Sequence, residues 1–241
     1  MFFSRAGLLA CLLFALVSCS RRAENAGPER IAILRFENLS PDVSLSWMGR
    51  AFSEIIGEEL AGSPDMRVIS SSRLHRYDRA LGMRPVTAPG ISTESPQALA
   101  AGATRIVYGD YTVRNGRLEV QVTIEDPRTL RMTQTFTVSA LPGDVLRAAT
   151  DVARHISPRI KPYVSQNPEA VAAYMQALET GDTTRMEMGL RAAIQADPDF
   201  GLAYRTLTAE RAQRGDRAGA LSVVEQAVEL SNCLLRVRAA A

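Results

Sequence analysis

The strongest constraint on the fold is a short apolar run that changes directly into the pattern of a helix. Residues 31–34 read Ile-Ala-Ile-Leu, which is typical of a strand buried on both faces. The polar residues 37–42 then favour a loop. From Ser44 to Leu60 apolar residues recur every three or four positions, which predicts a helix with one apolar face. A buried strand, a loop and an amphipathic helix form the first half of a βαβ unit, so we expect an α/β domain here.

Composition limits the classes of protein to consider. The chain has 241 residues, of which 46% are hydrophobic and 22% charged, as in an ordinary globular protein with one or two domains. The formal net charge is +2 and the basic residues are scattered, so we expect no nucleic-acid partner. The cysteines at positions 11, 19 and 233 have no metal-binding spacing, and we expect no metal or cofactor.

Residues 1–19 have the layout of a secretory signal peptide. Arg5 precedes an apolar core, residues 6–17, that is too short to span a hydrocarbon layer of roughly 30 Å. The segment ends in Leu16-Val17-Ser18-Cys19, which resembles the lipobox of bacterial lipoproteins. The resemblance implies cleavage between Ser18 and Cys19, a diacylglyceryl group on the thiol of Cys19, and an acyl chain such as palmitate on its new amine.

The residues after the cysteine bear on location. Ser20 stands where an Asp would favour retention in the inner membrane, so the resemblance implies the outer membrane, with the chain in the periplasm. Residues 20–29 hold little that could pack and predict a flexible tether. The alternative is an ordinary signal peptide with a chance cysteine at its cleavage site.

Residues 30–160 are expected to form one α/β domain. The patterns predict strands at 66–69, 105–114, 118–125 and 132–138, and helices from Ser70 to Leu81, from Thr93 or Ser95 to 101, and at 145–156. Asn115-Gly116 predicts a tight hairpin. Clean alternation in the last three strands predicts an antiparallel meander with one packed face, to which Met132, Phe136 and Val138 belong. The fold class is therefore α/β: a mixed sheet with an antiparallel meander, covered by helices.

The order of these segments resembles the amino-terminal domain of TolB-like proteins. The resemblance covers about residues 30–160 and depends on IAILRFENLSPD at 31–42, RVIS at 67–70 and a strand that reaches Gly109. Related domains occur in envelope lipoproteins that activate peptidoglycan synthases and in curli-secretion proteins. The resemblance therefore implies protein–protein contact in the envelope and no catalysis. Arg35 stands where the family usually has Pro, a difference that we expect to matter little.

Residues 167–241 contain a repeat with a period of 34 residues. Gly181-Asp182 recurs as Gly215-Asp216, and three apolar positions recur at the same offset: Leu190, Ala193 and Ile194 match Val224, Ala227 and Val228. The period, and a proline near the unit boundary, resemble the tetratricopeptide repeat, which implies an all-α segment with two antiparallel helices per unit.

The two units span residues 167–200 and 201 to about 234, fewer than the ~3 units that an independent array needs. We therefore expect the pair to pack on the first domain, on a partner or on another copy. Residues 231–241 predict a short terminal cap that docks, or the start of a truncated third unit.

The inner helices of these units predict a groove for a protein partner. The candidate groove residues are Tyr174, Leu178, Tyr204, Leu207 and Arg211. Most of these side chains could equally form the core between helices.

Other candidate sites are weaker. Glu37, Asp42 and Asp110 could gather near the strand ends, where α/β folds bind ligands, but no GxGxxG, GK[ST] or GxSxG motif accompanies them. His75 with Asp78, and the stripe Arg73, Arg76 and Arg79, are typical of solvated helix faces. Cys233 is either a buried small residue or a thiol for an intermolecular disulfide.

We therefore predict an outer-membrane lipoprotein, anchored through Cys19, that acts as a non-catalytic adaptor or scaffold for unidentified envelope proteins. Two alternatives remain open: an envelope enzyme or small-ligand sensor that uses the strand-end cleft, and a subunit of an oligomeric secretion or envelope complex, which would make the chain a homo-oligomer.

Overall fold

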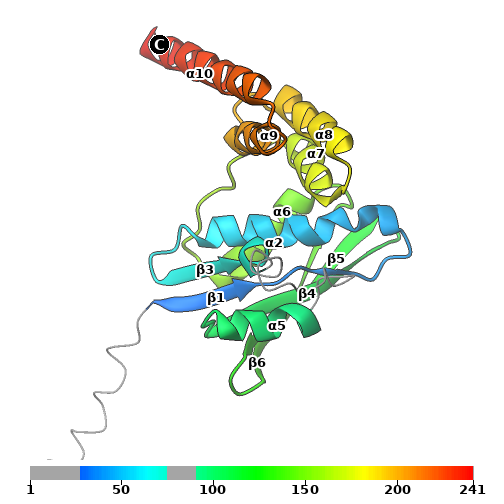
Figure 1. Ribbon diagram of the computed structural model, residues 1–241. Helices are drawn as coiled ribbons and strands as arrows, with labels where there is room; N and C mark the ends of the chain where they lie inside the picture. The colour runs from blue at the N-terminus through cyan, green and yellow to red at the C-terminus, as the bar shows by residue number, and fades with distance from the viewer. Residues whose placement is uncertain (1–27, 75–90, 241) are drawn as a thin grey trace, which may run out of the picture.

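The computed structural model describes residues 28–74 and 91–240, and a mixed sheet forms the centre of its α/β part (Figure 1). The order along the sheet is β3-β1-β4-β5-β6, and β2 pairs with β4 off this path. The strands are β1 Glu29–Ile33, β2 Glu37–Asn38, β3 Met66–Ser70, β4 Arg105–Arg114, β5 Arg117–Asp126 and β6 Arg131–Ala140.

Helices cover both faces of the sheet and continue beyond it. They are the 3-10 helix η2 Val43–Leu45, and the α-helices α2 Trp47–Leu60, α3 Ser71–Leu74, α5 Ile91–Ala100, α6 Val145–Ile156, α7 Pro168–Glu179, α8 Thr183–Ala196, α9 Gly201–Gln213 and α10 Arg217–Ala240. In Figure 1, α2 and α6 lie on one face of the sheet and α5 on the other. The fold class predicted from the sequence is confirmed.

The opening strand and its helix form as predicted. β1 lies between β3 and β4 and is parallel to both. Because neighbouring residues of a strand point to opposite faces, Ile31 and Ile33 join the core under α2 and α6, while Ala32 and Leu34 join the core beside α3 and α5. All four are completely buried, which confirms a strand covered on both faces.

The antiparallel meander is also confirmed. β4 pairs with β5 and β5 with β6, and both Asn115 and Gly116 have positive φ, as a tight two-residue hairpin turn requires. The prediction for Met132 is wrong, since its side chain is 65% exposed. β6 is an edge strand, and α6 packs against its later half, where Phe136 stacks on His155 at a ring distance of 4.9 Å.

Two predicted helix starts have different outcomes. α3 begins at Ser71, as expected, but residues 75–90, which include His75, Asp78, Arg76 and Arg79, lie outside the described part. α5 already includes Ile91, so Thr93 and Ser95 lie inside it and do not cap it. The completely buried Glu94 fixes this helix to the sheet, because its carboxylate accepts hydrogen bonds from the Arg35 amide (2.7 Å) and the Ser71 hydroxyl.

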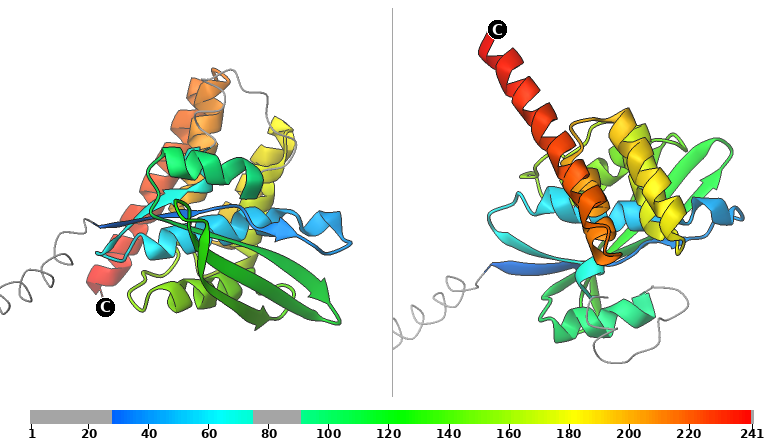
Figure 2. Two further views of the ribbon diagram at one scale, coloured as in Figure 1. Left: turned by 90° about the horizontal axis from the view of Figure 1, so that it is seen from below. Right: turned by 45° about the horizontal axis from the view of Figure 1, so that its top comes forward.

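The C-terminal part consists of two helical hairpins, α7–α8 and α9–α10, stacked on the side of α2 that faces away from the sheet (Figures 1 and 2). The side chain of Asn167 caps α7 and that of Asp182 caps α8. α7 and α8 approach so closely that a Cβ atom on Gly189 would lie 2.8 Å from the Cβ atom of Ala177. A small residue is therefore required at this crossing.

The end of the chain differs from the expected separate cap. α10 continues without a break from Arg217 to Ala240, through residues 231–240. Residues 220–240 contain no glycine or proline that would stop a helix.

Candidate functional site

An ion cluster joins the C-terminal hairpins to the sheet. Arg35, which follows β1, donates from its two terminal nitrogens to the two carboxylate oxygens of Glu179 at 2.8 Å each, and also to the carbonyl of Ser46 at 3.1 Å. Arg50 of α2 donates to the same carboxylate. Burial raises the pKa of Glu179, but the hydrogen bonds from Arg35 and Arg50 outweigh it and hold the pKa below its usual value. The expectation that Arg35 matters little is therefore wrong.

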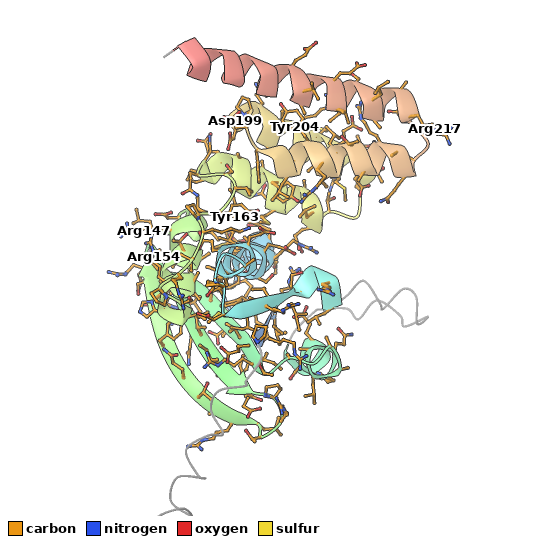
Figure 3. The ribbon with its side chains drawn as sticks, turned by 90° about the vertical axis from the view of Figure 1, so that its left-hand side faces the viewer. Arg147, Arg154, Tyr163, Asp199, Tyr204 and Arg217 are labelled. Atoms are coloured by element: carbon orange, nitrogen blue, oxygen red, sulfur yellow. The ribbon has the colours of Figure 1, made fainter. Side chains whose placement is uncertain are left out.

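An aromatic cluster extends this junction. Tyr163, in the segment between α6 and α7, contacts Phe200 at a ring distance of 6.3 Å, and Tyr174 of α7 contacts the same ring at 5.0 Å. Burial raises the pKa of Tyr163 well above its usual value. One continuous hydrophobic core therefore runs from the sheet through α2 into the hairpins (Figure 3).

Most residues of the predicted partner groove are buried in the structure. Tyr174, Tyr204 and Leu207 are 7%, 5% and 1% exposed, because they form the core between helices. Leu178 is half-buried, and the guanidinium of Arg211 is held by Glu187. For most of this set the burial favours the alternative that the sequence left open, inter-helix core, while Tyr204 also lines a groove on α9 and α10.

Glu187 of α8 is the centre of a second ion cluster, between the two hairpins. Its carboxylate accepts hydrogen bonds from Arg211, from Arg214 at 2.6 Å and from Arg191 at 3.1 Å. The bonds from Arg211 and Arg214 lower the pKa of Glu187 to about 2. Arg211 is therefore a structural residue that ties α9 to α8.

An open apolar groove lies on the outer side of the second hairpin. It has a volume of about 620 Å³ and is lined from α9 by Tyr204, Arg205, Thr208, Ala209 and Ala212, and from α10 by Val224, Ala227 and Val228. Val224 is 42% and Val228 52% exposed, and Leu221, one turn earlier on α10, is 59% exposed. Sequence reasoning named Tyr204 among these lining residues and missed the others. The 34-residue offset contains a signal for those on α10, because Val224, Ala227 and Val228 match Leu190, Ala193 and Ile194, which are buried.

Of the three strand-end acids, Glu37 and Asp110 come together, whereas Asp42 has a separate capping role. Asp42 caps η2: its carboxylate accepts hydrogen bonds from the hydroxyl (2.6 Å) and the amide (2.9 Å) of Ser44, which lower its pKa. Glu37 and Asp110 are register partners on β2 and β4. Burial, and then the charge of Glu37, raise the pKa of Asp110. The groove on α9 and α10 contains none of the three.

Other predicted residues are accounted for as follows. Ser18 and Cys19 lie outside the described residues, and Cys233 is a residue of α10. His155 stacks on Phe136 and its Nδ1 bonds to the carbonyl of Asp151 at 2.8 Å, so it packs α6 on the sheet. Within residues 28–74 and 91–240, no three acidic, histidine or cysteine side chains are grouped to hold a metal ion. No helix in that same part is long and apolar enough to cross a membrane.

Comparisons with known proteins add limited information. No protein-family model and no curated protein matches the chain. Among solved structures, the LpoB C-terminal domain from Salmonella enterica is 15% identical, covers 53% of this chain and 93% of its own, and has a TM-score of 0.37. TolB from Acinetobacter baumannii is 18% identical over 53% of this chain and 27% of its own, with a TM-score of 0.35. Lipoprotein GNA1162 from Neisseria meningitidis is 15% identical over 54% and 97%, with a TM-score of 0.37. At these identities and TM-scores, none of the three assigns a function to this chain.

Proposed function

We propose that this chain is an outer-membrane lipoprotein, anchored through Cys19, that serves as a non-catalytic adaptor for envelope proteins in the periplasm. The observation that carries the proposal is Leu16-Val17-Ser18-Cys19 at the end of a short signal-type apolar core. Acyl chains on both the thiol and the amine of Cys19 would provide the more than one lipid signal that stable anchoring needs.

The arrangement of the folded part supports an adaptor. Residues 20–29 would allow a reach of at most roughly 35 Å between the lipid and β1 when extended. The chain enters the sheet at β1, whereas the second hairpin lies beyond α2, away from the sheet (Figure 1). β1 and the apolar groove are thus on different parts of one body, which the Arg35–Glu179 pair holds together. A membrane surface would raise the local concentration of such a body for its partners.

The anchor is tested by replacing its cysteine. C19A should leave the outer-membrane fraction and lose incorporation of labelled palmitate, since no thiol remains to accept a lipid. C11A is the matched control, because it removes a cysteine from the apolar core of the signal and leaves the cleavage site unchanged. A C19A protein that still floats with membranes would contradict the anchor.

The adaptor role is tested by crosslinking in the native envelope, followed by mass spectrometry. We expect envelope proteins to be recovered with the anchored wild type, and in smaller amounts with C19A, which lacks the surface restriction. Equal recovery with both forms, or recovery of none, would contradict an adaptor that depends on its anchor.

A further inference from the structure

The groove on the second hairpin corresponds to a surface of the first hairpin that another helix, α9, covers. α8 packs against both α7 and α9, and its Leu190, Ala193 and Ile194 are at most 8% exposed. The residues 34 positions later, Val224, Ala227 and Val228, line the open groove on α10. A helix covers the earlier surface, so a helix is the shape of occupant that the groove fits.

The occupant differs from α9 in one respect. Glu187 of α8 binds Arg211 and Arg214 near the end of α9. The residue 34 positions after Glu187 is Leu221, which is 59% exposed. A helix in the groove would therefore face Leu221 at the position where α9 faces the carboxylate of Glu187. The residue of that helix that lies opposite Leu221 should therefore be apolar.

The chain itself carries a helix of this kind. α10 has 24 residues where α8 has 14, and its last part runs past the end of α9 in all three views of Figures 1 and 2. In the sequence, Leu234 and Leu235 follow Ala227 and Val228 by seven residues each, so the apolar period of α10 continues into this projecting part.

Charges along α10 favour one orientation. The exposed Glu225 and Glu229 lie in its first part, next to the groove, and the sequence of the projecting part has Arg236 and Arg238 and no acidic residue. Two copies of α10 that lie antiparallel bring each acidic part against the other's basic part, whereas parallel copies bring like charges together.

We propose that the α9–α10 groove binds the projecting end of α10 from a second copy of this chain. The two α10 helices lie antiparallel across each other, so that each copy supplies one groove and one helix to a two-fold symmetric dimer. The proposal does not depend on the lipid anchor.

The first test measures the mass of the mature, unacylated chain, residues 20–241, which keeps every described residue. Sedimentation equilibrium under reducing conditions excludes a disulfide through Cys233. We expect twice the monomer mass for the wild type. V228R adds a second cation to a groove that Arg205 already lines, against the basic end of the partner's α10, and should weaken the dimer at least about 100-fold.

M188R is the matched control, since Met188 is a 66%-exposed residue on α8, outside the groove. It should remain dimeric, and both variants should keep the helical circular dichroism and thermal midpoint of the wild type. A monomeric wild type would overturn the proposal and leave the groove to a helix of another protein. A dimer that V228R leaves intact, or that M188R also dissociates, would place the interface elsewhere.

The second test probes the orientation by charge reversal. E225R combined with E229R should dissociate the dimer, because arginines then face the basic end of the partner. Adding R236E and R238E to the same chain should restore it. Restoration would support antiparallel packing, and a fourfold variant that stays monomeric would overturn it.

Discussion

Arg35 and Glu179 are 144 residues apart in the sequence, yet two hydrogen bonds of 2.8 Å join the guanidinium of one to the carboxylate of the other. Arg35 lies at the end of the opening strand and Glu179 at the end of α7, so the pair closes the junction between the sheet and the helical hairpins. Their side chains are only 15% and 23% exposed, which limits screening by solvent.

The first prediction concerns this pair. R35A leaves the partly buried Glu179 with Arg50 as its remaining cation, and E179A leaves Arg35 without its carboxylate, so each should lower the free energy of unfolding by about 2 kcal/mol. In a double-mutant cycle the two effects should not add, with a coupling of about 1 kcal/mol or more. Urea denaturation of the four proteins measures both quantities.

The control for the pair is R191A. Arg191 is 55% exposed in its ion pair with Glu187, and exposed pairs contribute about 0–1 kcal/mol. If R35A costs no more than R191A, the Arg35–Glu179 pair does not hold the hairpins on the sheet.

The second prediction is a loss of stability in acid that depends on Glu187. Its pKa of about 2 in the folded protein lies below the ordinary value of 4.5, so its contribution is present above pH 4.5 and is lost as the pH falls toward 2. E187Q should flatten the dependence of the unfolding free energy on pH in that window. The exposed Glu119 of β5 is the control, and an E119Q profile that flattens equally would contradict the assignment.

The third prediction has the opposite sign. Glu59 of α2 is 1% exposed, its Oε1 accepts a hydrogen bond from Thr150 at 2.8 Å, and its Oε2 has no partner among the described residues. Burial raises its pKa above 4.5, and the bond from Thr150 opposes this only in part. The folded protein therefore loses stability as the pH rises from 4.5 through the raised pKa.

E59Q removes the charge, so the unfolding free energy at pH 7 should rise by about 1 kcal/mol and its decline above pH 4.5 should disappear. T150V removes the bond that favours the charged form and should steepen the decline. Thermal unfolding across pH 4–8 measures both, and an E59Q protein with an unchanged slope would disprove the role of this carboxylate.

The fourth prediction concerns Gly109 of β4. A Cβ atom there would lie 2.2 Å from the carbonyl oxygen of Gln121 and 2.6 Å from the Phe36 ring, so G109A should cost about 2 kcal/mol or more. A Cβ atom on Gly143 would meet nothing within 4 Å, and G143A should change stability by less than about 1 kcal/mol. Equal urea midpoints for the two variants would contradict the close approach at Gly109.

The elements that follow from short-range periodicity agree best with the sequence prediction. Residues 31–34, the Asn115-Gly116 turn and the alternation through Leu118 and Val120 depend on neighbours one to four residues away, and the structure confirms all of them. Met132 fits the same alternation yet is exposed, because burial also requires that α6 reach that end of the strand.

Residues whose role depends on distant segments could not be assigned in this way. Tyr174 and Leu207 have the spacing of a groove and of a core alike, and the packing of α9 against the first hairpin makes them core. The role of Arg35 does not follow from local pattern, because its partner Glu179 is 144 residues away.

Periodicity, capping residues and turn chemistry therefore account for most of the strands and helices that the structure describes, since each acts within a few residues. Which faces stay open, and which charges meet, depends on how those elements pack. Leu190 and Ile194 are buried on α8, whereas the matching Val224 and Val228 are exposed on α10, because α8 has a helix on each side and α10 leaves an open groove beside α9.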